Sequence, residues 1–229
     1  MALPHAVLPV EIRCRGVLFD MDGILISSIG SVERSWTKWA EMRGVDPEFA
    51  CKMAHGRRAI ETAALLRPDL DSEAELRVIE DIELADDEGL AVLPGVLDLV
   101  HALPADRWTV VTSATNRLAR TRLAQAGVPV PARLVTADDV EQGKPDPAPY
   151  LAGAELLGVP PEECVVFEDS ESGVKAGHAA GCAVIATTFS HDAESLADAH
   201  YLIEDVTGVS VRILPAGQGI VLTFMPLAD

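Results

Sequence analysis

The chain has few basic residues and no long apolar run. Its 229 residues include 18 Lys and Arg against 36 Asp and Glu, which gives a formal net charge of −18. Such a surface repels nucleic-acid backbones and anionic lipids, so we expect neither as a partner. No stretch approaches the roughly 20 apolar residues that a membrane-spanning helix requires.

Cysteines are also few, and they lie far apart in the sequence. They are Cys14, Cys51, Cys164 and Cys182, with no Cys-x-x-Cys pair and no Cys/His spacing of a zinc site. We therefore expect reduced thiols, as in proteins of the cytoplasm. A hydrophobic content of 48 % is ample for a packed core. Together these features predict a globular cytoplasmic protein.

Apolar runs that alternate with helical stretches predict the fold class. Both faces of a strand inside a parallel sheet are covered, so such strands are apolar along their whole length. Four runs fit this description, at 16–19, 108–112, 164–167 and 182–186. Helical stretches lie between them, and glycines end those at 118–126 and 148–157. The alternation predicts an α/β fold with a doubly wound parallel sheet.

Residues 28–88 break the alternation, because their pattern is helical throughout. Apolar side chains recur there at three- and four-residue spacing, as in Val32, Trp36 and Trp39. We expect both tryptophans to lie in the core of this segment rather than to stack on a sugar.

These patterns define the expected domains. A helical domain at 28–88 is inserted into a core made of residues 1–27 and 89–229. Near the end of the chain, 209–214 and 220–224 are typical of a hairpin or an edge pair of strands.

Two aspartates follow the first apolar run, in the tetrapeptide Asp20-Met-Asp22-Gly23. Gly23 permits a sharp turn, so both carboxylates can point at one spot. Like charges this close need a cation between them, or one of them must be protonated. Mg²⁺ fits best, because it prefers hard oxygen ligands and is often held by one or two carboxylates. A solvated turn is the alternative for the tetrapeptide taken alone.

Further polar groups occur where later strands end. Glu168 and Asp169 follow the third run, and ligands of α/β sheets bind at the carboxyl ends of strands. Lys144 lies between a glycine and a proline, which hold it in a fixed place. Ser113 and Thr115 precede a helix, where hydroxyl and N–H groups bind anions, although either could equally cap the helix.

These residue types together predict phosphoryl transfer. One carboxylate attacks phosphorus, and a second gives and takes the proton of the departing and attacking oxygens. Mg²⁺, a lysine, a hydroxyl and backbone N–H groups balance the negative charge. In so acidic a chain, the divalent ion and Lys144 are needed to attract an anionic substrate.

The chain resembles the haloacid dehalogenase-like hydrolases, in the branch with a helical cap inserted after the first strand. Four family motifs occur in order: Asp20-Met-Asp22-Gly23, Val111-Thr112-Ser113, Gly143-Lys144-Pro145 and Phe167-Glu168-Asp169-Ser170. The resemblance covers residues 15–205. It implies an α/β fold in which a Rossmann-like parallel sheet forms the core and the insertion forms the cap.

The resemblance also implies catalytic roles. Asp20 would be the nucleophile that forms an aspartyl-phosphate, and Asp22 would be the general acid/base. Lys144 would pair with Asp20 and with the phosphate, and Ser113 would donate a hydrogen bond to a phosphoryl oxygen. Dehalogenases of this superfamily lack an acid/base aspartate two residues after the nucleophile, so Asp22 favours phosphate esters over haloacids.

Binding residues follow from the same resemblance. The implied Mg²⁺ ligands are Asp20, Asp169, the backbone carbonyl of Asp22 and, directly or through water, Glu168. The residues expected to bind substrate in the core are Ser113 and Lys144, together with Ala114 and Asn116 from the segment at the start of a helix. In the cap they are His55, Arg57 and Arg58, for which a solvated helix start with ordinary surface arginines is the alternative.

A narrower resemblance concerns the substrate. The segments 55–58, 136–150 and 186–189 resemble those of sugar- and polyol-phosphate phosphatases, a group with glycerol phosphate and 2-deoxyglucose-6-phosphate phosphatases. We therefore expect hydrolysis of small sugar or polyol phosphates. A monomer suits a cap that must open.

Two alternatives remain. Phosphomutases of the β-phosphoglucomutase type share core and cap, but they carry a histidine where this chain has Val32. A non-catalytic receiver-like module also gathers acidic residues, a hydroxyl and a lysine at strand ends. Receivers, however, are about half this length and have no helical insertion after the first strand.

Overall fold

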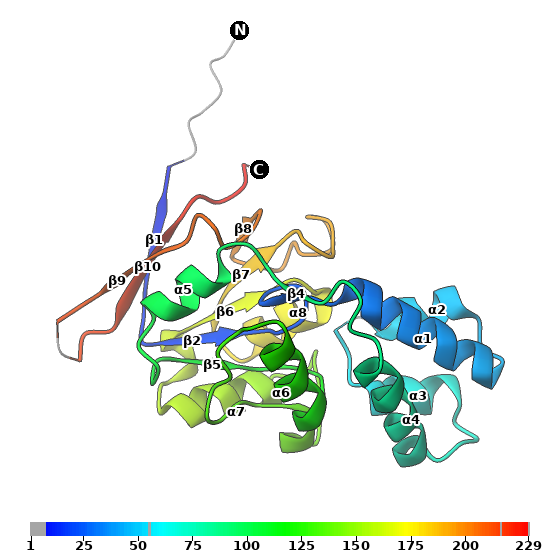
Figure 1. Ribbon diagram of the computed structural model, residues 1–229. Helices are drawn as coiled ribbons and strands as arrows, with labels where there is room; N and C mark the ends of the chain where they lie inside the picture. The colour runs from blue at the N-terminus through cyan, green and yellow to red at the C-terminus, as the bar shows by residue number, and fades with distance from the viewer. Residues whose placement is uncertain (1–7, 55, 216, 229) are drawn as a thin grey trace, which may run out of the picture.

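A five-stranded parallel sheet forms the centre of the computed structural model, which describes residues 8–54, 56–215 and 217–228 (Figure 1). The strand order is β5-β2-β6-β7-β8. The four predicted strands are β2 (Gly16–Phe19), β5 (Trp108–Val110), β6 (Cys164–Glu168) and β7 (Ala183–Thr187). The fifth, β8 (Tyr201–Ile203), was not predicted and extends the sheet at one edge.

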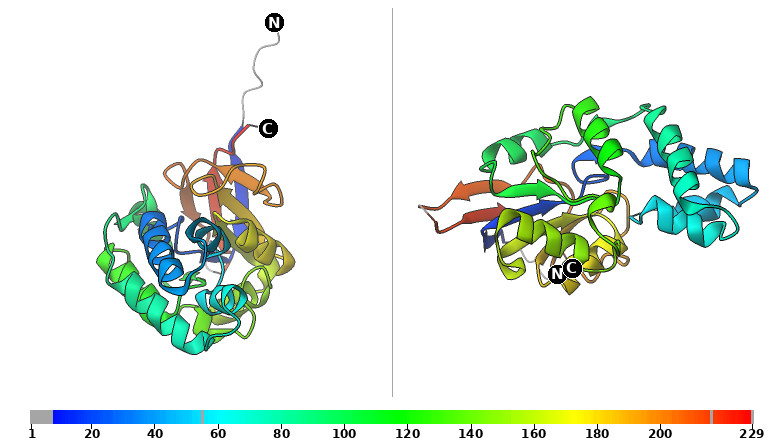
Figure 2. Two further views of the ribbon diagram at one scale, coloured as in Figure 1. Left: turned by 90° about the vertical axis from the view of Figure 1, so that its right-hand side faces the viewer. Right: turned by 90° about the horizontal axis from the view of Figure 1, so that it is seen from below.

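Helices cover both faces of this sheet, which explains why its strands are apolar throughout. Phe19 points to the face covered by α5 (Val96–Ala102) and α6 (Asn116–Gln125). Leu18 points to the face covered by α7 (Ala148–Leu157) and α8 (Glu171–Ala179). The right-hand view of Figure 2 shows the sheet between these layers. The predicted Rossmann-like α/β architecture is therefore confirmed.

Four helices are inserted between β3 (Ile26–Ser27) and β4 (Ala91–Val92), which pair with each other antiparallel. They are α1 (Ile29–Arg43), α2 (Pro47–Ala54), α3 (Ala59–Leu66) and α4 (Ser72–Leu84), and they lie beside the sheet in Figure 1. We call residues 29–84 the helical insertion. Trp36 and Trp39 are buried in its own apolar cluster, as the sequence predicted.

A second sheet joins the two ends of the described chain. β9 (Ser210–Ile213) and β10 (Ile220–Phe224) form the predicted antiparallel pair. β1 (Val10–Cys14), which the sequence did not reveal, pairs antiparallel with β10. Two short 3₁₀ turns, η1 (Ala137–Asp139) and η2 (Pro161–Glu163), complete the elements of the described chain.

Within the described ranges, no helix has both the length and the apolarity to cross a membrane. All four cysteines are free thiols. Burial raises the pKa of Cys14, Cys164 and Cys182 to about 12, so these three remain unreactive thiols near neutral pH.

Replacing Trp39 tests the packing of the helical insertion. Its ring is fully buried, and its Nε1 donates to Glu75 Oε2 at 2.7 Å. Trp39→Ala leaves a cavity and removes this donor, so we expect unfolding free energy to fall by about 3–5 kcal/mol in urea titrations followed by circular dichroism. Trp39→Phe, which keeps most of the ring, should cost less. A loss below about 1 kcal/mol for Trp39→Ala would contradict this packing.

Candidate active site

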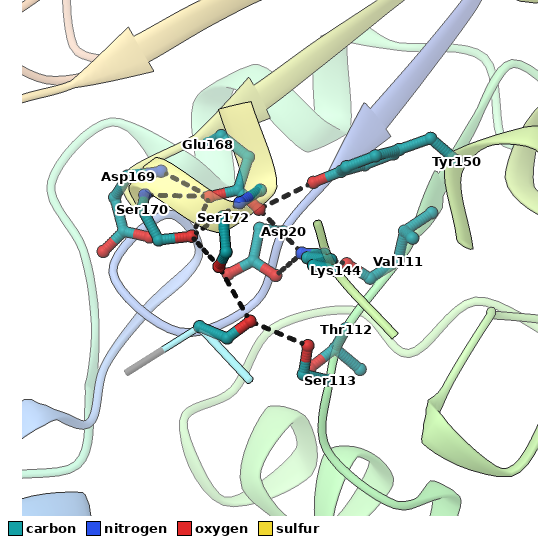
Figure 3. Close-up of polar contacts among 12 residues, drawn as sticks. Asp20, Val111, Thr112, Ser113, Lys144, Tyr150, Glu168, Asp169, Ser170 and Ser172 are labelled. Atoms are coloured by element: carbon teal, nitrogen blue, oxygen red, sulfur yellow. Dashed lines mark hydrogen bonds and ion pairs between the residues drawn. The ribbon is translucent and has the colours of Figure 1, made fainter. Parts of the chain in front are cut away.

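The carboxyl ends of β2 and β6 bring the acidic residues of two motifs together. β2 and β6 are neighbours in the sheet, and the N–H of Asp20 donates to the Phe167 carbonyl at 2.9 Å. Figure 3 shows Asp20, Glu168 and Asp169 close together, with Lys144 beside them. Three segments far apart in the sequence therefore meet at one edge of the sheet.

Lys144 lies almost completely buried between two carboxylates. Its Nζ donates to Asp20 Oδ1 at 2.5 Å, to Glu168 Oε1 at 2.7 Å and to the Val111 carbonyl at 3.2 Å. Burial by itself lowers the pKa of Lys144, but the charges of Asp20 and Glu168 outweigh it and raise the pKa above its usual value. The ammonium group therefore stays charged and fixes one oxygen of Asp20.

Glu168 is fully engaged by protein donors. Its Oε1 accepts from Lys144 and from the Tyr150 hydroxyl, the latter at 2.8 Å. Its Oε2 accepts the N–H groups of Asp169 and Ser170 at 2.8 and 2.9 Å and the Ser170 hydroxyl at 3.0 Å. Although burial raises the pKa of Glu168, Lys144 and these donors lower it below its usual value. Its oxygens therefore anchor Lys144 and the loop after β6.

Two glycines allow this close packing. A Cβ at Gly173 in α8 would lie 1.6 Å from Glu168 Oε1, and a Cβ at Gly23 would lie 1.7 Å from Asp169 Oδ2. Gly23 also has a φ of +80°, which other residues rarely adopt. Any side chain at either position would displace a carboxylate.

Asp20, Glu168 and Asp169 form a buried acidic cluster in which one oxygen of each carboxylate lies within 4.8 Å of one oxygen of the other two. Burial raises the pKa of Asp20 to about 7, with Lys144 opposing and Glu168 and Asp22 adding to the rise. Burial and the neighbouring carboxylates raise the pKa of Asp169 well above its usual value. A cation between Asp20 and Asp169 would relieve this repulsion, and carboxylate oxygens suit a hard divalent ion. The donor set therefore fits the metal that the sequence suggested.

The loop after β5 contributes hydroxyl and N–H groups. Ser113 and Ala114 line the cavity described below, and the Ala114 N–H donates to Thr112 Oγ1 at 3.1 Å. Thr115 caps α6 by accepting from the Leu118 N–H, which settles the choice between the two hydroxyls. Ser113 is therefore the hydroxyl of the two that is not used to cap the helix.

Asn116 does not reach the cavity, in contrast to its expected role in substrate binding. Its N–H donates to Asp138 Oδ2 at 2.8 Å, and its side-chain oxygen accepts from Arg120 at 3.0 Å. The backbone N–H of Asn116, which could donate to a phosphate, is thus already bonded to Asp138.

The loop between α2 and α3 lies over the acidic cluster. The Gly56 carbonyl accepts from Ser113 Oγ at 3.2 Å and from Ser172 Oγ at 3.1 Å. Arg57 is exposed and lines the cavity, as expected of a residue that attracts an anion. His55, the third expected binding residue of this loop, lies outside the described residues.

Arg58 joins the helical insertion to the loop that carries Lys144. Its Nη1 donates to the Glu141 carbonyl at 2.9 Å and to Glu61 Oε1 at 3.2 Å. Glu61 Oε1 in turn accepts from the Gly143 N–H at 3.2 Å. Arg58 also lines the cavity, so its expected contact with substrate stays a prediction beside this bridge between insertion and core.

A cavity of about 380 Å³ separates the helical insertion from the acidic cluster. Asp20, Asp22, Ser113 and Asp169 line its floor, and Val32, Trp36 and Leu76 line it from the insertion. Lys144 is not among its lining residues, since it lies beneath Asp20. The cavity therefore offers a polar floor and a partly apolar roof to a small ligand.

Asp22 lines the cavity but lies outside the acidic cluster. Its Oδ1 accepts from the Ser28 hydroxyl and, at 3.4 Å, from Arg122 Nη1. Sequence reasoning missed Ser28 and Arg122. The one available signal was that Arg122 lies four residues after Leu118, on the apolar face of its helix.

Known proteins resemble this chain over most of its length. A family model described as haloacid dehalogenase-like hydrolase matches residues 14–181. Hexitol phosphatase A of Escherichia coli is 40 % identical over 91 % of this chain and 99 % of its own. Glycerol-1-phosphate phosphohydrolase 2 of Saccharomyces cerevisiae is 35 % identical over 80 % and 79 %. The crystal structure of CbbY from Rhodobacter sphaeroides in complex with phosphate has a TM-score of 0.71 at 26 % identity, covering 85 % and 95 %.

Divalent cations should stabilise the protein more at high pH than at low pH. The pKa of Asp20 rises on folding from 3.8 to about 7, so without a cation its stabilising contribution is lost as the pH rises through that range. At Mg²⁺ near 100 times its Kd, we expect thermal shift assays to show a rise in Tm of about 5–10 °C at pH 8 and a smaller one at pH 5.5. Asp169→Asn should weaken the effect. Equal rises at both pH values would contradict the cluster as the metal site.

Proposed function

We propose that this chain, which belongs to the haloacid dehalogenase-like hydrolase family, is a Mg²⁺-dependent phosphatase that acts on small sugar or polyol phosphate monoesters. The observation that carries the proposal is the charged Lys144 held between Asp20 and Glu168 beside Asp169. The matched phosphatases confirm the family that the four motifs predicted.

The proposed reaction has two steps on one carboxylate. A free oxygen of Asp20 attacks phosphorus, and the bond to the ester oxygen breaks as Asp22 gives that oxygen a proton. Water then attacks the aspartyl-phosphate and passes a proton to Asp22, which releases inorganic phosphate and restores Asp20. Asp20, Asp169 and the Asp22 carbonyl would hold Mg²⁺, which would neutralise negative charge there. Lys144 holds Asp20 in place. Ser113 and Ala114, in the loop after β5, hold the phosphoryl oxygens.

The charges around the cavity support a neutral leaving group. Arg58 and Arg122, two of the arginines that line it, already contact carboxylates of the chain. Arg57 lies exposed, where we propose that it attracts the phosphate. Glu73 also lines the cavity, and a carboxylate there accepts hydrogen bonds from hydroxyl groups but repels a second phosphate. This combination favours sugar or polyol monophosphates.

We further propose that residues 28–88 act as a cap over a core of residues 1–27 and 89–229, in a cytoplasmic monomer. The separate apolar cluster of the helical insertion and its short β3–β4 connection support this division. Closing such a cap over the cavity excludes bulk water from the acyl-phosphate.

Removing the nucleophile, the general acid/base or the metal should nearly abolish turnover. For Asp20→Asn, Asp22→Asn or wild type with a chelator, we expect phosphate release from glycerol and hexitol phosphates to fall at least about 100-fold, because each loses a group required for transfer. The assay is free phosphate release across a panel that includes nucleotides as poor substrates. Full activity of Asp20→Asn would exclude the aspartyl-phosphate route.

A second assay separates hydrolysis from the phosphomutase alternative. Val32 lines the cavity at the position where the mutases carry a histidine, so no imidazole there can shuttle a proton to a second hydroxyl. With β-glucose 1-phosphate, we expect free phosphate rather than glucose 6-phosphate. Glucose 6-phosphate as the main product would favour the mutase.

A further inference from the structure

Arg122 is a buried cation in the core that faces the helical insertion. It lies on α6 with only 4 % of its side chain exposed. Buried guanidinium groups are retained only where carboxylates or other acceptors pair with them. The groups that pair with Arg122 come from three separate segments.

The two ends of its guanidinium fork reach different partners. Nη1 donates to Asp22 Oδ1 at 3.4 Å, in the loop that follows the nucleophile. Nη2 donates to Ser31 Oγ at 3.4 Å, in the first turn of α1, and lies 3.7 Å from Glu83 Oε1, in the last turn of α4. α1 begins and α4 ends the helical insertion. Arg122 therefore contacts Asp22 and both ends of the insertion at once.

The two carboxylate oxygens of Asp22 differ in their hydrogen bonds. Oδ1 accepts from Arg122 and from the Ser28 hydroxyl, just before α1. Among the described residues, no hydrogen bond to Oδ2 is formed, while the side chain lines the cavity and is 32 % exposed. A general acid/base of this kind needs one oxygen held and the other open to the reacting groups.

We propose that Arg122 is a positioning residue: it holds Oδ1 of Asp22 so that Oδ2 faces the ester oxygen, and it does so only while both ends of the helical insertion are docked. The inference rests on the proposed phosphatase function. It assigns the proton transfer to a geometry that the insertion completes, rather than to Asp22 alone. An ordinary buried ion pair would join Arg122 to Glu83 and leave Asp22 untouched.

Leaving groups of different basicity test this role. The alkoxide of glycerol 1-phosphate needs a proton as it departs, whereas the nitrophenolate of p-nitrophenyl phosphate does not. For Arg122→Met, we expect kcat/KM to fall about 100-fold with glycerol 1-phosphate and less than about 5-fold with p-nitrophenyl phosphate. Arg122→Lys keeps the charge but loses the fork, so its loss should be intermediate and show the same preference. This milder variant decides the matter should Arg122→Met not fold.

Arg117 provides the matched control. It lies on the same helix and pairs with Glu80 and Asp81 of α4 at 2.8 and 3.2 Å, but it does not contact Asp22. Arg117→Met should leave both kcat/KM values within about twofold of wild type. Equal losses on both esters for the Arg122 variants, or the same discrimination in Arg117→Met, would overturn the inference alone. A wild type that hydrolyses neither ester would overturn the proposed function and the inference together.

Discussion

The ammonium group of Lys144 can be buried only because a carboxylate lies on either side of it. An isolated charge in this position would cost several kcal/mol, and hydrogen bonds of 2.5 and 2.7 Å to Asp20 and Glu168 offset that cost. Each carboxylate stands at the end of its own strand, and β2 and β6 are adjacent. The strand order, the hydroxyl of Tyr150 in α7 and the lack of a side chain at Gly173 all keep these three groups in contact.

One ammonium does not balance the cluster. Asp20, Glu168 and Asp169 supply three buried carboxylates, and a phosphate ester brings further negative charge to the same place. Burial first, and then the neighbouring carboxylates, raise the pKa values of Asp20 and Asp169. The whole chain also has a net charge of −18, which repels an anion. Localised positive charge is therefore needed where the anionic substrate binds.

Much of this site could be predicted from the sequence, because its acidic residues directly follow strands that are apolar on both faces. Asp20 and Asp169 could therefore be assigned to one edge of the sheet, whereas Lys144, which follows no such strand, was assigned to it from its flanking glycine and proline and from the resemblance. Other features depend on contacts that no local pattern records. β1 pairs with a strand some 200 residues later, and the partners of Arg122 depend on how the helical insertion docks. Asn116 was assigned to the ligand because it begins a helix, yet Asp138 occupies its N–H.

A ligand that enters the cavity must replace the Gly56 carbonyl as the hydrogen-bond acceptor of Ser113. This carbonyl accepts hydrogen bonds from the hydroxyls of Ser113 and Ser172. A phosphoryl oxygen that accepts a hydrogen bond from Ser113 must therefore first displace this peptide oxygen. The serine keeps one acceptor before and after, and the loop rather than bulk water is the competitor. When inorganic phosphate leaves the site, the Gly56 carbonyl can accept from Ser113 again. This returning hydrogen bond favours the departure of phosphate.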